Sequence, residues 1–273
     1  MSALVTGGGS GIGRALAEAL ARQMPVGIAG RRPEPLAETV ARVQGGVDGA
    51  GRRAYAVAAD LGDRESCRAL VREVTAELGP IEVLINNAGD GGAVRRLSAG
   101  DADAWQRTLT TNVLAPAWLC AEVVPGMVER GSGTVLNVNS MQGSRAFPGC
   151  TAYGASKAAL MRLTEGLAEE VAGTGVLVAD VSPGLVRTDM TAEPDLAALL
   201  AVVPPEEWTP VDKVVDLVLA LVSRGDDAVR QAVHGRFVHA EDDLDDLVAR
   251  LAGADDDGRR LRMTPLRPDP LLD

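Results

Sequence analysis

Short apolar segments alternate with longer segments of helical periodicity over the first 181 residues of the chain. The apolar segments are Ala3–Thr6, Val26–Ala29, Ala54–Ala58, Ile81–Ile85, Thr134–Asn137 and Val176–Val181. The helical segments between them are Arg14–Arg22, Pro35–Val47, Arg64–Leu78, Asp101–Arg130 and Ala152–Val171. Strands joined by helices pair in parallel, because each helix carries the chain back across the sheet. The alternation therefore predicts an α/β fold, a doubly wound parallel sheet of about seven strands with helices on both faces.

The length of 273 residues suits one large domain that needs neither disulfides nor metals. We predict a single Rossmann-type domain over residues 1–252, with Gly235–His239 as its last strand. The pattern loosens after Pro183, and residues 189–212 are expected to form a variable lobe. Acidic residues at 241–246 can cap a helix that runs through Leu247–Leu251. Residues 253–273 form a predicted C-terminal tail.

The composition excludes several classes of protein. The formal net charge is −11 and no basic cluster is present, so we expect no nucleic-acid partner. The longest apolar run, Leu196–Val203, is too short to cross a bilayer, so we expect no membrane partner. Cys67, Cys120 and Cys150 lack the spacing of metal ligands. We therefore expect reduced thiols in a cytoplasmic protein, and no metal site.

A glycine-rich turn connects the first predicted strand to the first predicted helix. Glycines at such a turn let the backbone approach a pyrophosphate, which the free N–H groups of the helix then bind. The strict GxGxxG spacing is absent, but the strand, turn and helix that it requires are present. The turn predicts a dinucleotide site, and the alternative is a turn that only tightens packing. The predicted contacts are Gly7, Gly9, Ser10, Gly11, Ile12 and Gly13.

Two arginines, Arg31 and Arg32, follow the second predicted strand. A dinucleotide site often carries an acidic residue there for the ribose 2′-hydroxyl, whereas an arginine can pair with a 2′-phosphate. The pair predicts NADP in preference to NAD. The alternative is that both arginines are solvated loop residues.

Tyr153 and Lys157 are four residues apart, and Ser140 precedes the tyrosine by thirteen residues. On a helix, Tyr153 and Lys157 project from the same face. A carbonyl that accepts a hydride develops negative charge on its oxygen and needs a proton donor and a fixed hydrogen bond. Tyr153 can donate the proton and Ser140 can hold the oxygen. For the reverse reaction, the Lys157 cation can supply the roughly 4 kcal/mol that lowers the phenol pKa from ~10 toward 7.

Together these motifs resemble the short-chain dehydrogenase/reductase family, in its compact branch. The resemblance covers about Ala3 to Thr188 and rests on Thr6-Gly7-x-x-x-Gly11-x-Gly13, Asn86-Asn87-Ala88-Gly89, Ser140 and Tyr153-x-x-x-Lys157. It implies that Asp60 and Leu61 contact the adenine, that Asn112 holds a water of a proton relay, and that Lys157 also bonds the nicotinamide ribose. The further cofactor contacts that it implies are Asn87, Ala88, Gly89, Pro183, Gly184, Val186 and Thr188.

The motifs and the chemistry predict an NADP(H)-dependent oxidoreductase that interconverts a small carbonyl compound and its alcohol. The predicted catalytic residues are Asn112, Ser140, Tyr153 and Lys157. Two alternatives are an NAD-dependent dehydrogenase of the same family and a dinucleotide-binding redox sensor without turnover. The family also implies a homodimer or homotetramer, although an acidic segment replaces the paired glycines that usually follow the last strand.

The substrate pocket is expected to lie between the segment after Ser140 and the variable lobe. Its predicted lining is mostly apolar and compatible with many ketones, aldehydes and alcohols. Within the lobe, Ala192–Val203 is expected to form a short helix that covers the site. The predicted lining residues are Met141, Gln142, Phe147, Cys150, Leu185 and Met190–Trp208.

Overall fold

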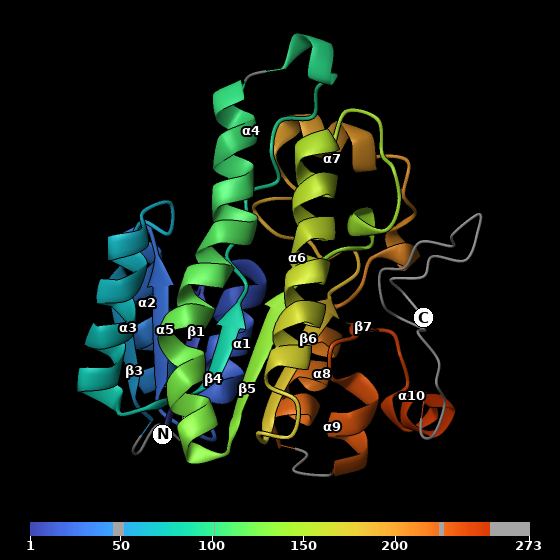
Figure 1. The fold of residues 1–273 in the computed structure, drawn as a ribbon. Coiled ribbons are helices and arrows are strands. Elements are labelled where there is room, and N and C mark those ends of the chain that lie inside the picture. Colours follow the sequence, from blue (N-terminus) through green and yellow to red (C-terminus); the bar gives the residue numbers. More distant parts are fainter. Residues whose placement is uncertain (46–51, 101, 224–226, 252–273) are drawn as a thin grey trace.

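The computed structural model describes residues 1–45, 52–100, 102–223 and 227–251. In these residues seven parallel strands form one sheet, in the order β3-β2-β1-β4-β5-β6-β7 (Figure 1). The strands are β1 Ser2–Thr6, β2 Val26–Gly30, β3 Ala54–Ala58, β4 Ile81–Asn86, β5 Gly133–Val138, β6 Val176–Ser182 and β7 Phe237–His239. This confirms the doubly wound sheet. The strand order reverses between β1 and β4, and ligands of such sheets bind at the carboxyl ends of the strands on either side of that point.

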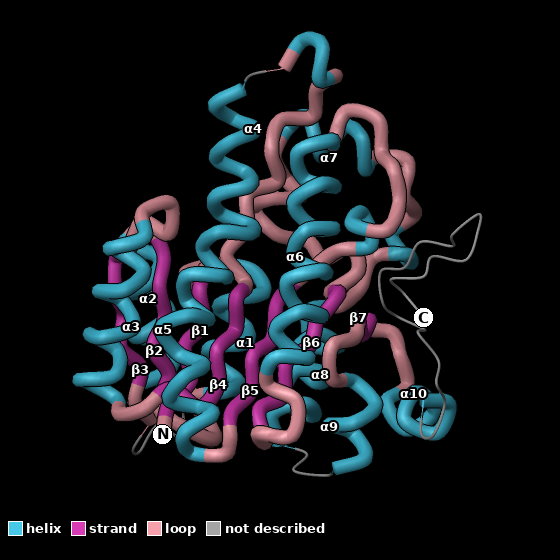
Figure 2. Tube along the Cα trace, viewed as in Figure 1, coloured by secondary structure: helices cyan, strands magenta, loops and turns pink. Residues whose placement is uncertain are grey.

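Helices connect the strands on both faces of the sheet (Figure 2). They are α1 Gly11–Leu20, α2 Pro33–Gly45, α3 Arg64–Leu78, α4 Ala102–Leu109, α5 Ala115–Arg130, α6 Thr151–Glu170, α7 Pro194–Leu200, α8 Val211–Ser223, α9 Asp227–Val233 and α10 Leu244–Leu251. The single helix predicted over Asp101–Arg130 is interrupted by a π-helical turn, Thr110–Leu114, between α4 and α5. The predicted lobe helix is α7, which is shorter than expected. Helices α8 and α9 were not predicted, and the predicted tail lies outside the described residues.

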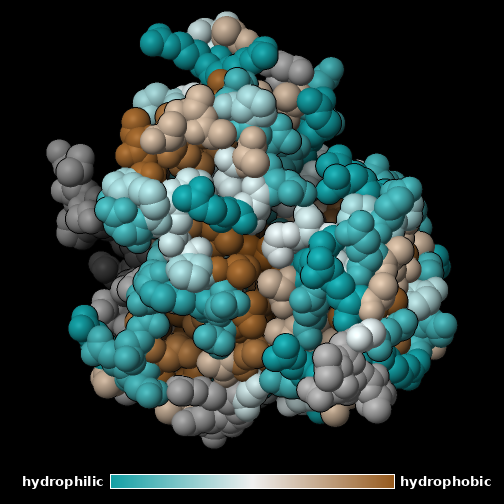
Figure 3. All heavy atoms as spheres, turned by 180° about the vertical axis from the view of Figure 1, so that it is seen from behind, coloured by the Kyte–Doolittle hydropathy of each residue, from teal (hydrophilic) through white to brown (hydrophobic). Residues whose placement is uncertain are grey.

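Each face of the sheet buries its own apolar cluster, because alternate residues of a strand point to opposite faces. On one face, Leu16 of α1 and Val218 of α8 pack with Val5 of β1. On the other face, Val74 of α3 and Leu119 of α5 pack below the sheet in a second cluster. Figure 3 shows the molecule from behind the view of Figure 1; hydrophilic atoms cover most of this side, and an apolar strip lies near its middle.

The continuous helical segment Ala102–Arg130 is long and apolar enough to cross a membrane by length and composition alone. Core helices of soluble proteins pass the same test, so this observation is weak. In the structure α5 packs against α3 and β4, and Leu119 is almost completely buried there. The apolar character of this segment is therefore explained by its contacts with the sheet.

Candidate active site

The side chains of Ser140, Tyr153 and Lys157 meet at the carboxyl end of β5. Ser140 follows that strand and Tyr153 and Lys157 lie in the first two turns of α6. The Ser140 side chain acts on the Tyr153 hydroxyl and lowers its pKa. Lys157 Nζ lies 5.6 Å from the centre of the Tyr153 ring and donates to the Val138 carbonyl at 2.7 Å. The structure thus brings these three predicted residues together.

Burial favours the neutral forms of both Tyr153 and Lys157. Loss of solvent raises the pKa of Tyr153 to about 12, and the hydrogen bond with Ser140 opposes this shift. Burial lowers the pKa of Lys157 to about 8, and the charge of Asp180 opposes that shift. Tyr153 therefore holds its proton at neutral pH, as a proton donor must. To act as a base it needs additional positive charge nearby.

Asn112 lies in the π-helical turn and is buried. Its Oδ1 accepts a hydrogen bond from the Asp90 N–H at 2.7 Å, and its Nδ2 donates to the Asp90 carbonyl at 2.9 Å. The same Nδ2 also donates to Ser156 Oγ of α6 at 2.9 Å. The amide therefore links the loop after β4 to the helix that carries Tyr153. Its part in a water relay remains a prediction.

The turn between β1 and α1 has the shape that a pyrophosphate requires. Ser10 precedes α1 without capping it through its side chain, and the first turn of the helix holds no acidic residue. A Cβ on Gly13 would lie 2.2 Å from the Gly7 carbonyl oxygen, and one on Gly11 would lie 3.1 Å from Thr188 Cγ2. Only glycine fits at Gly13, and the φ of 51° at Gly11 favours glycine there as well. Because the N–H groups at the start of α1 lack a side-chain cap, the turn fits an anionic ligand.

A hollow of about 290 Å³ lies at the carboxyl ends of β2 and β3, lined by Arg31, Ala58, Ala59 and Asp60. Both Arg31 and Asp60 were predicted to contact the adenosine part of the cofactor. The side chain of Leu61, in contrast, is buried in the core below the sheet. Any contact of Leu61 with an adenine must therefore come from its backbone.

Arg32 and Asn87 are held by other parts of the protein. Arg32 lies 3.5 Å from Asp189, and both side chains are exposed. Asn87 Nδ2 donates to the Thr6 carbonyl at 2.8 Å, and Thr6 Oγ1 accepts from the N–H groups of Asn87 and Ala88 at 3.0 Å. These bonds join the ends of β1 and β4, where the sheet order reverses.

The segment after β6 passes close to the glycine-rich turn. Gly184 has a φ of 70°, and a Cβ there would lie 2.2 Å from Thr209 Oγ1. Val186 is buried, and the Thr188 N–H donates to Thr191 Oγ1 at 2.9 Å. The predicted cofactor residues of this segment therefore sit on a tightly fixed loop, opposite Gly11.

A row of buried polar residues, not predicted from the sequence, lies below these side chains. Asn86 of β4 donates to Asn137 of β5, Asn137 donates to Thr164 of α6, and Thr164 donates to Asp180 of β6, each at 2.8 Å. Asp180 also acts on Lys157. The signal in the sequence was a carboxylate inside the otherwise uncharged, mostly apolar strand Val176–Ser182.

The fold and the site together define a dinucleotide-dependent oxidoreductase: a glycine-rich turn at the reversal point of a parallel sheet, next to a proton donor, a hydroxyl and an ammonium. The sequence profile of the family described as short chain dehydrogenase matches residues 1–197. The chain belongs to the short-chain dehydrogenase/reductase family.

Similar proteins support this membership. A short chain dehydrogenase of Pseudocercospora fijiensis is 34% identical over 259 residues, which cover 89% of this chain and 81% of that protein. A metagenomic short-chain oxidoreductase solved in complex with NADP is 27% identical, with a TM-score of 0.69 and coverage of 82% of this chain and 91% of that one. An NAD⁺-bound xylitol dehydrogenase is 26% identical, with a TM-score of 0.76 and coverage of 87% and 96%. The cofactor of the present chain is therefore an NAD(P) dinucleotide.

Proposed function

We propose that this oxidoreductase uses NADP(H) and interconverts a small ketone or aldehyde and the corresponding alcohol. The observation that carries the proposal is the cluster of Ser140, Tyr153 and Lys157 at the carboxyl end of β5. A protonated phenol beside a hydroxyl is suited to stabilise the oxygen of a carbonyl as it is reduced.

The roles of the side chains follow from their positions. The nicotinamide, when bound, supplies or accepts the hydride. Tyr153 donates its proton to the substrate oxygen during reduction and takes it back during oxidation. The Ser140 hydroxyl, which also lowers the pKa of Tyr153, holds the same oxygen. Lys157 places positive charge 5.6 Å from the Tyr153 ring and so favours the phenolate that forms after proton transfer. Asn112 fixes the loop at Asp90 and, we propose, also a water that returns a proton to Tyr153.

The preference for NADP is supported by Arg31. This arginine lines the hollow next to Asp60, whereas the neighbouring Arg32 is paired with Asp189. A guanidinium binds a phosphate through two parallel hydrogen bonds, and a solvated hydroxyl gains much less from it. NAD dependence is the second candidate function, because a similar solved structure carries NAD⁺.

The proposal is tested by following NADPH absorbance with a panel of ketones, aldehydes and secondary alcohols. Tyr153→Phe is expected to reduce kcat at least 10³-fold on any compound that the wild type turns over, because general acid catalysis and the protonated hydroxyl are lost together. NADPH affinity, measured by fluorescence, should change less than about threefold. An active Tyr153→Phe enzyme contradicts the mechanism. Tight NADPH binding without turnover across the whole panel would favour the redox sensor instead.

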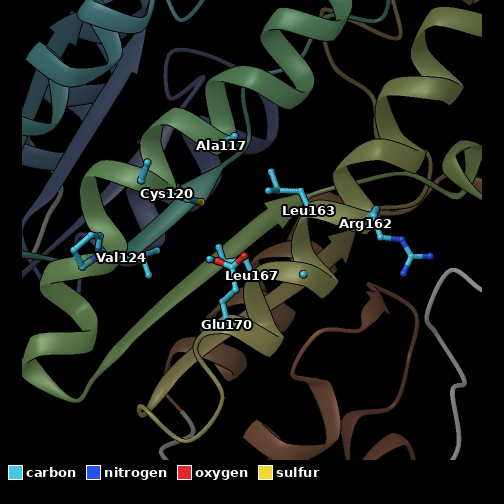
Figure 4. A pocket seen from close by; sticks show the side chains of 10 residues that line it. Ala117, Cys120, Val124, Arg162, Leu163, Leu167 and Glu170 are labelled. Atoms are coloured by element: carbon cyan, nitrogen blue, oxygen red, sulfur yellow. The ribbon is translucent and has the colours of Figure 1, made fainter. Parts of the chain in front are cut away.

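We also propose that the chain forms a homodimer or homotetramer through α5 and α6. A hollow of about 480 Å³ lies on the outer surface of these two helices (Figure 4). Most of its lining residues are small or apolar, among them Ala117, Ala121, Leu163, Gly166 and Leu167, and Arg162 and Glu170 also line it. Such a surface can accept a helix of another copy at close range.

A further inference from the structure

A carboxylate is buried in β6, next to the proposed active site. Asp180 is 2% exposed, and every residue of its strand is buried. Val176 and Val178, on the same face of the strand, belong to the apolar cluster below α6. An ionised side chain in such a place costs several kcal/mol unless hydrogen bonds or an opposite charge compensate it. The partners of Asp180 therefore decide what it does.

Hydrogen bonds explain a polar residue at this position but not a charged one. Asp180 Oδ1 accepts from Thr164 Oγ1 at 2.8 Å, at the end of the chain of bonds that begins at Asn86. The Asn139 side chain also interacts with the carboxylate. An asparagine could accept the Thr164 bond equally well without the cost of burying a charge. The charge itself therefore calls for another explanation.

Lys157 supplies that explanation. Its side chain is 5% exposed, and Nζ donates to the carbonyl of Val138 on β5. Asn137, the residue before Val138, pairs in register with Asp180 on the neighbouring strand. The negative charge of Asp180 raises the pKa of Lys157 and so opposes the effect of burial. A neutral carbonyl alone does not compensate a buried ammonium.

We propose that Asp180 is a positioning residue: its buried carboxylate is the counter-charge that keeps Lys157 protonated beside Tyr153. The consequence for catalysis rests on the proposed function, because it takes Tyr153 as the proton donor. The electrostatic pairing itself does not depend on that function. If Asp180 keeps Lys157 charged, the reaction needs it in addition to the four proposed catalytic residues, although Asp180 touches neither Tyr153 nor the substrate.

Several titratable groups surround this pair. On α6, Glu165 raises the pKa of Asp180, while the positive charge of Lys157 lowers it. Burial has the largest effect and brings the pKa of Asp180 to about 7. On the other side, Cys150 acts on Tyr153. The carboxylate therefore ionises in the neutral range, where a change in its charge alters the proton affinity of Lys157.

The chain itself provides a direct measurement, because it contains only two lysines, Lys157 and Lys213. Full-length protein labelled with ¹³C at lysine Cε gives two signals, which Lys213→Arg assigns. Titration without cofactor or substrate then yields the pKa of Lys157. Asp180→Asn is expected to lower this pKa by about one unit, a tenfold loss of proton affinity. The pKa of Lys213, which pairs with Glu241 at the surface, should stay the same.

Glu165→Gln is the matched control, since it makes the same carboxylate-to-amide change at a group that acts on Asp180. It should leave the pKa of Lys157 unchanged or raise it slightly. An unchanged Lys157 pKa in Asp180→Asn would overturn the proposal and leave Asp180 a purely structural role.

If Asp180→Asn does not fold, the wild type alone decides. The titration curve of its Lys157 signal must then show a second step at the pH where Asp180 ionises. A curve with a single step overturns the proposal. Because this titration needs no turnover, its result is independent of whether the proposed substrates are correct.

Discussion

Burial suits the proposed role of Tyr153 but works against that of Lys157. It stabilises the neutral phenol, which a proton donor needs at neutral pH, but it also stabilises the neutral amine, which would not favour the phenolate. The lysine therefore depends on its surroundings for its charge. Position on one helix face brings the two side chains together, and the residues on β5 and β6 determine how they ionise.

The buried carboxylate should make the stability of the protein depend on pH. The pKa of Asp180 is raised in the folded state, to about 7 from 3.8, so the folded chain binds more protons than the unfolded chain between these values. The free energy of unfolding therefore falls as the pH rises from about 4 to 7. Lys157, with its pKa lowered to about 8, has the opposite effect, and its contribution rises with pH only above about 8.

Asp180→Asn should remove the first of these two effects. Relative to wild type, the variant is expected to gain up to about 3.4 kcal/mol between pH 4.5 and pH 8, from the roughly two and a half units between pH 4.5 and the pKa of about 7, at 1.36 kcal/mol each. Urea unfolding at both pH values measures the difference. If the free energy of unfolding changes by the same amount between the two pH values in wild type and in the variant, the Asp180 carboxylate does not cause the pH dependence.

Arg31 should determine the choice of cofactor. Arg31→Ala is expected to weaken NADPH binding by ten- to a hundredfold, since a charge-assisted pair with a phosphate is lost, and to leave NADH binding within about threefold. Fluorescence titration of both cofactors measures this. Arg32→Ala is the matched control, because Arg32 is paired with Asp189 and should matter less. Equal NADPH affinity in wild type and Arg31→Ala would remove Arg31 from the explanation.

Among the elements, the π-helical turn is the one most directly tied to the site. A π-turn inserts one residue into a helix and often occurs at functional sites. Here it places Asn112 where its amide bonds both backbone groups of Asp90 and the hydroxyl of Ser156. The turn thereby couples three elements that the chain visits far apart in sequence.

Asn112→Ala should therefore lower the stability of the protein. It removes three hydrogen bonds and leaves the partly buried backbone groups of Asp90 without these partners, which we expect to cost about 2–4 kcal/mol of unfolding free energy. Leu114→Ala, in the same turn but 44% exposed, should cost less than about 1 kcal/mol. Chemical denaturation compares the two variants. Similar losses in both would mean that the amide is not what holds the turn.

The elements also show what the sequence could and could not predict. Six strands and the helices between them were predicted within a few residues, because β- and helix-type periodicities alternate clearly up to Val181. The π-turn was missed because a change in hydrogen-bond register within a helix leaves no mark on the residue pattern. The row from Asn86 to Asp180 was missed because it depends on strand register, which joins residues that are distant in the chain.

At the scale of the whole molecule, the two halves of the chain meet beside the glycine-rich turn. Gly11, from the first half, approaches Thr188 of the second, and Arg32 pairs with Asp189. Of the proposed catalytic residues, Ser140, Tyr153 and Lys157 come from the second half, after β5 and on α6, and Asn112 comes from the first half. The sheet therefore brings residues of both halves to the carboxyl ends of its strands.

The outer surface of α5 and α6 has a pattern that suits contact with an identical surface. A two-fold contact pairs residue i of one copy with residue j of the other and j with i. Arg162 and Glu170 lie four residues to either side of Gly166 and line the hollow together with it. If two α6 helices cross antiparallel at Gly166, each Arg162 faces Glu170 of the other copy. Arg162 also pairs with Glu165 of its own helix, at 2.6 Å, which holds the guanidinium at this surface.

The assembly is tested by placing a long charged side chain at the centre of this contact. In sedimentation at about 20 μM, the wild type should have at least twice the chain mass of 28.3 kDa. Gly166→Arg should shift it to the single chain, because the arginine fills the close approach and adds an unpaired charge. Gly45→Arg is the matched control: both glycines lie in helices, and a Cβ at either position meets no atom within 4 Å. Each single chain should therefore fold normally, so a monomeric Gly45→Arg would mean that the loss is not specific to α6. A monomeric wild type would remove the dimer altogether.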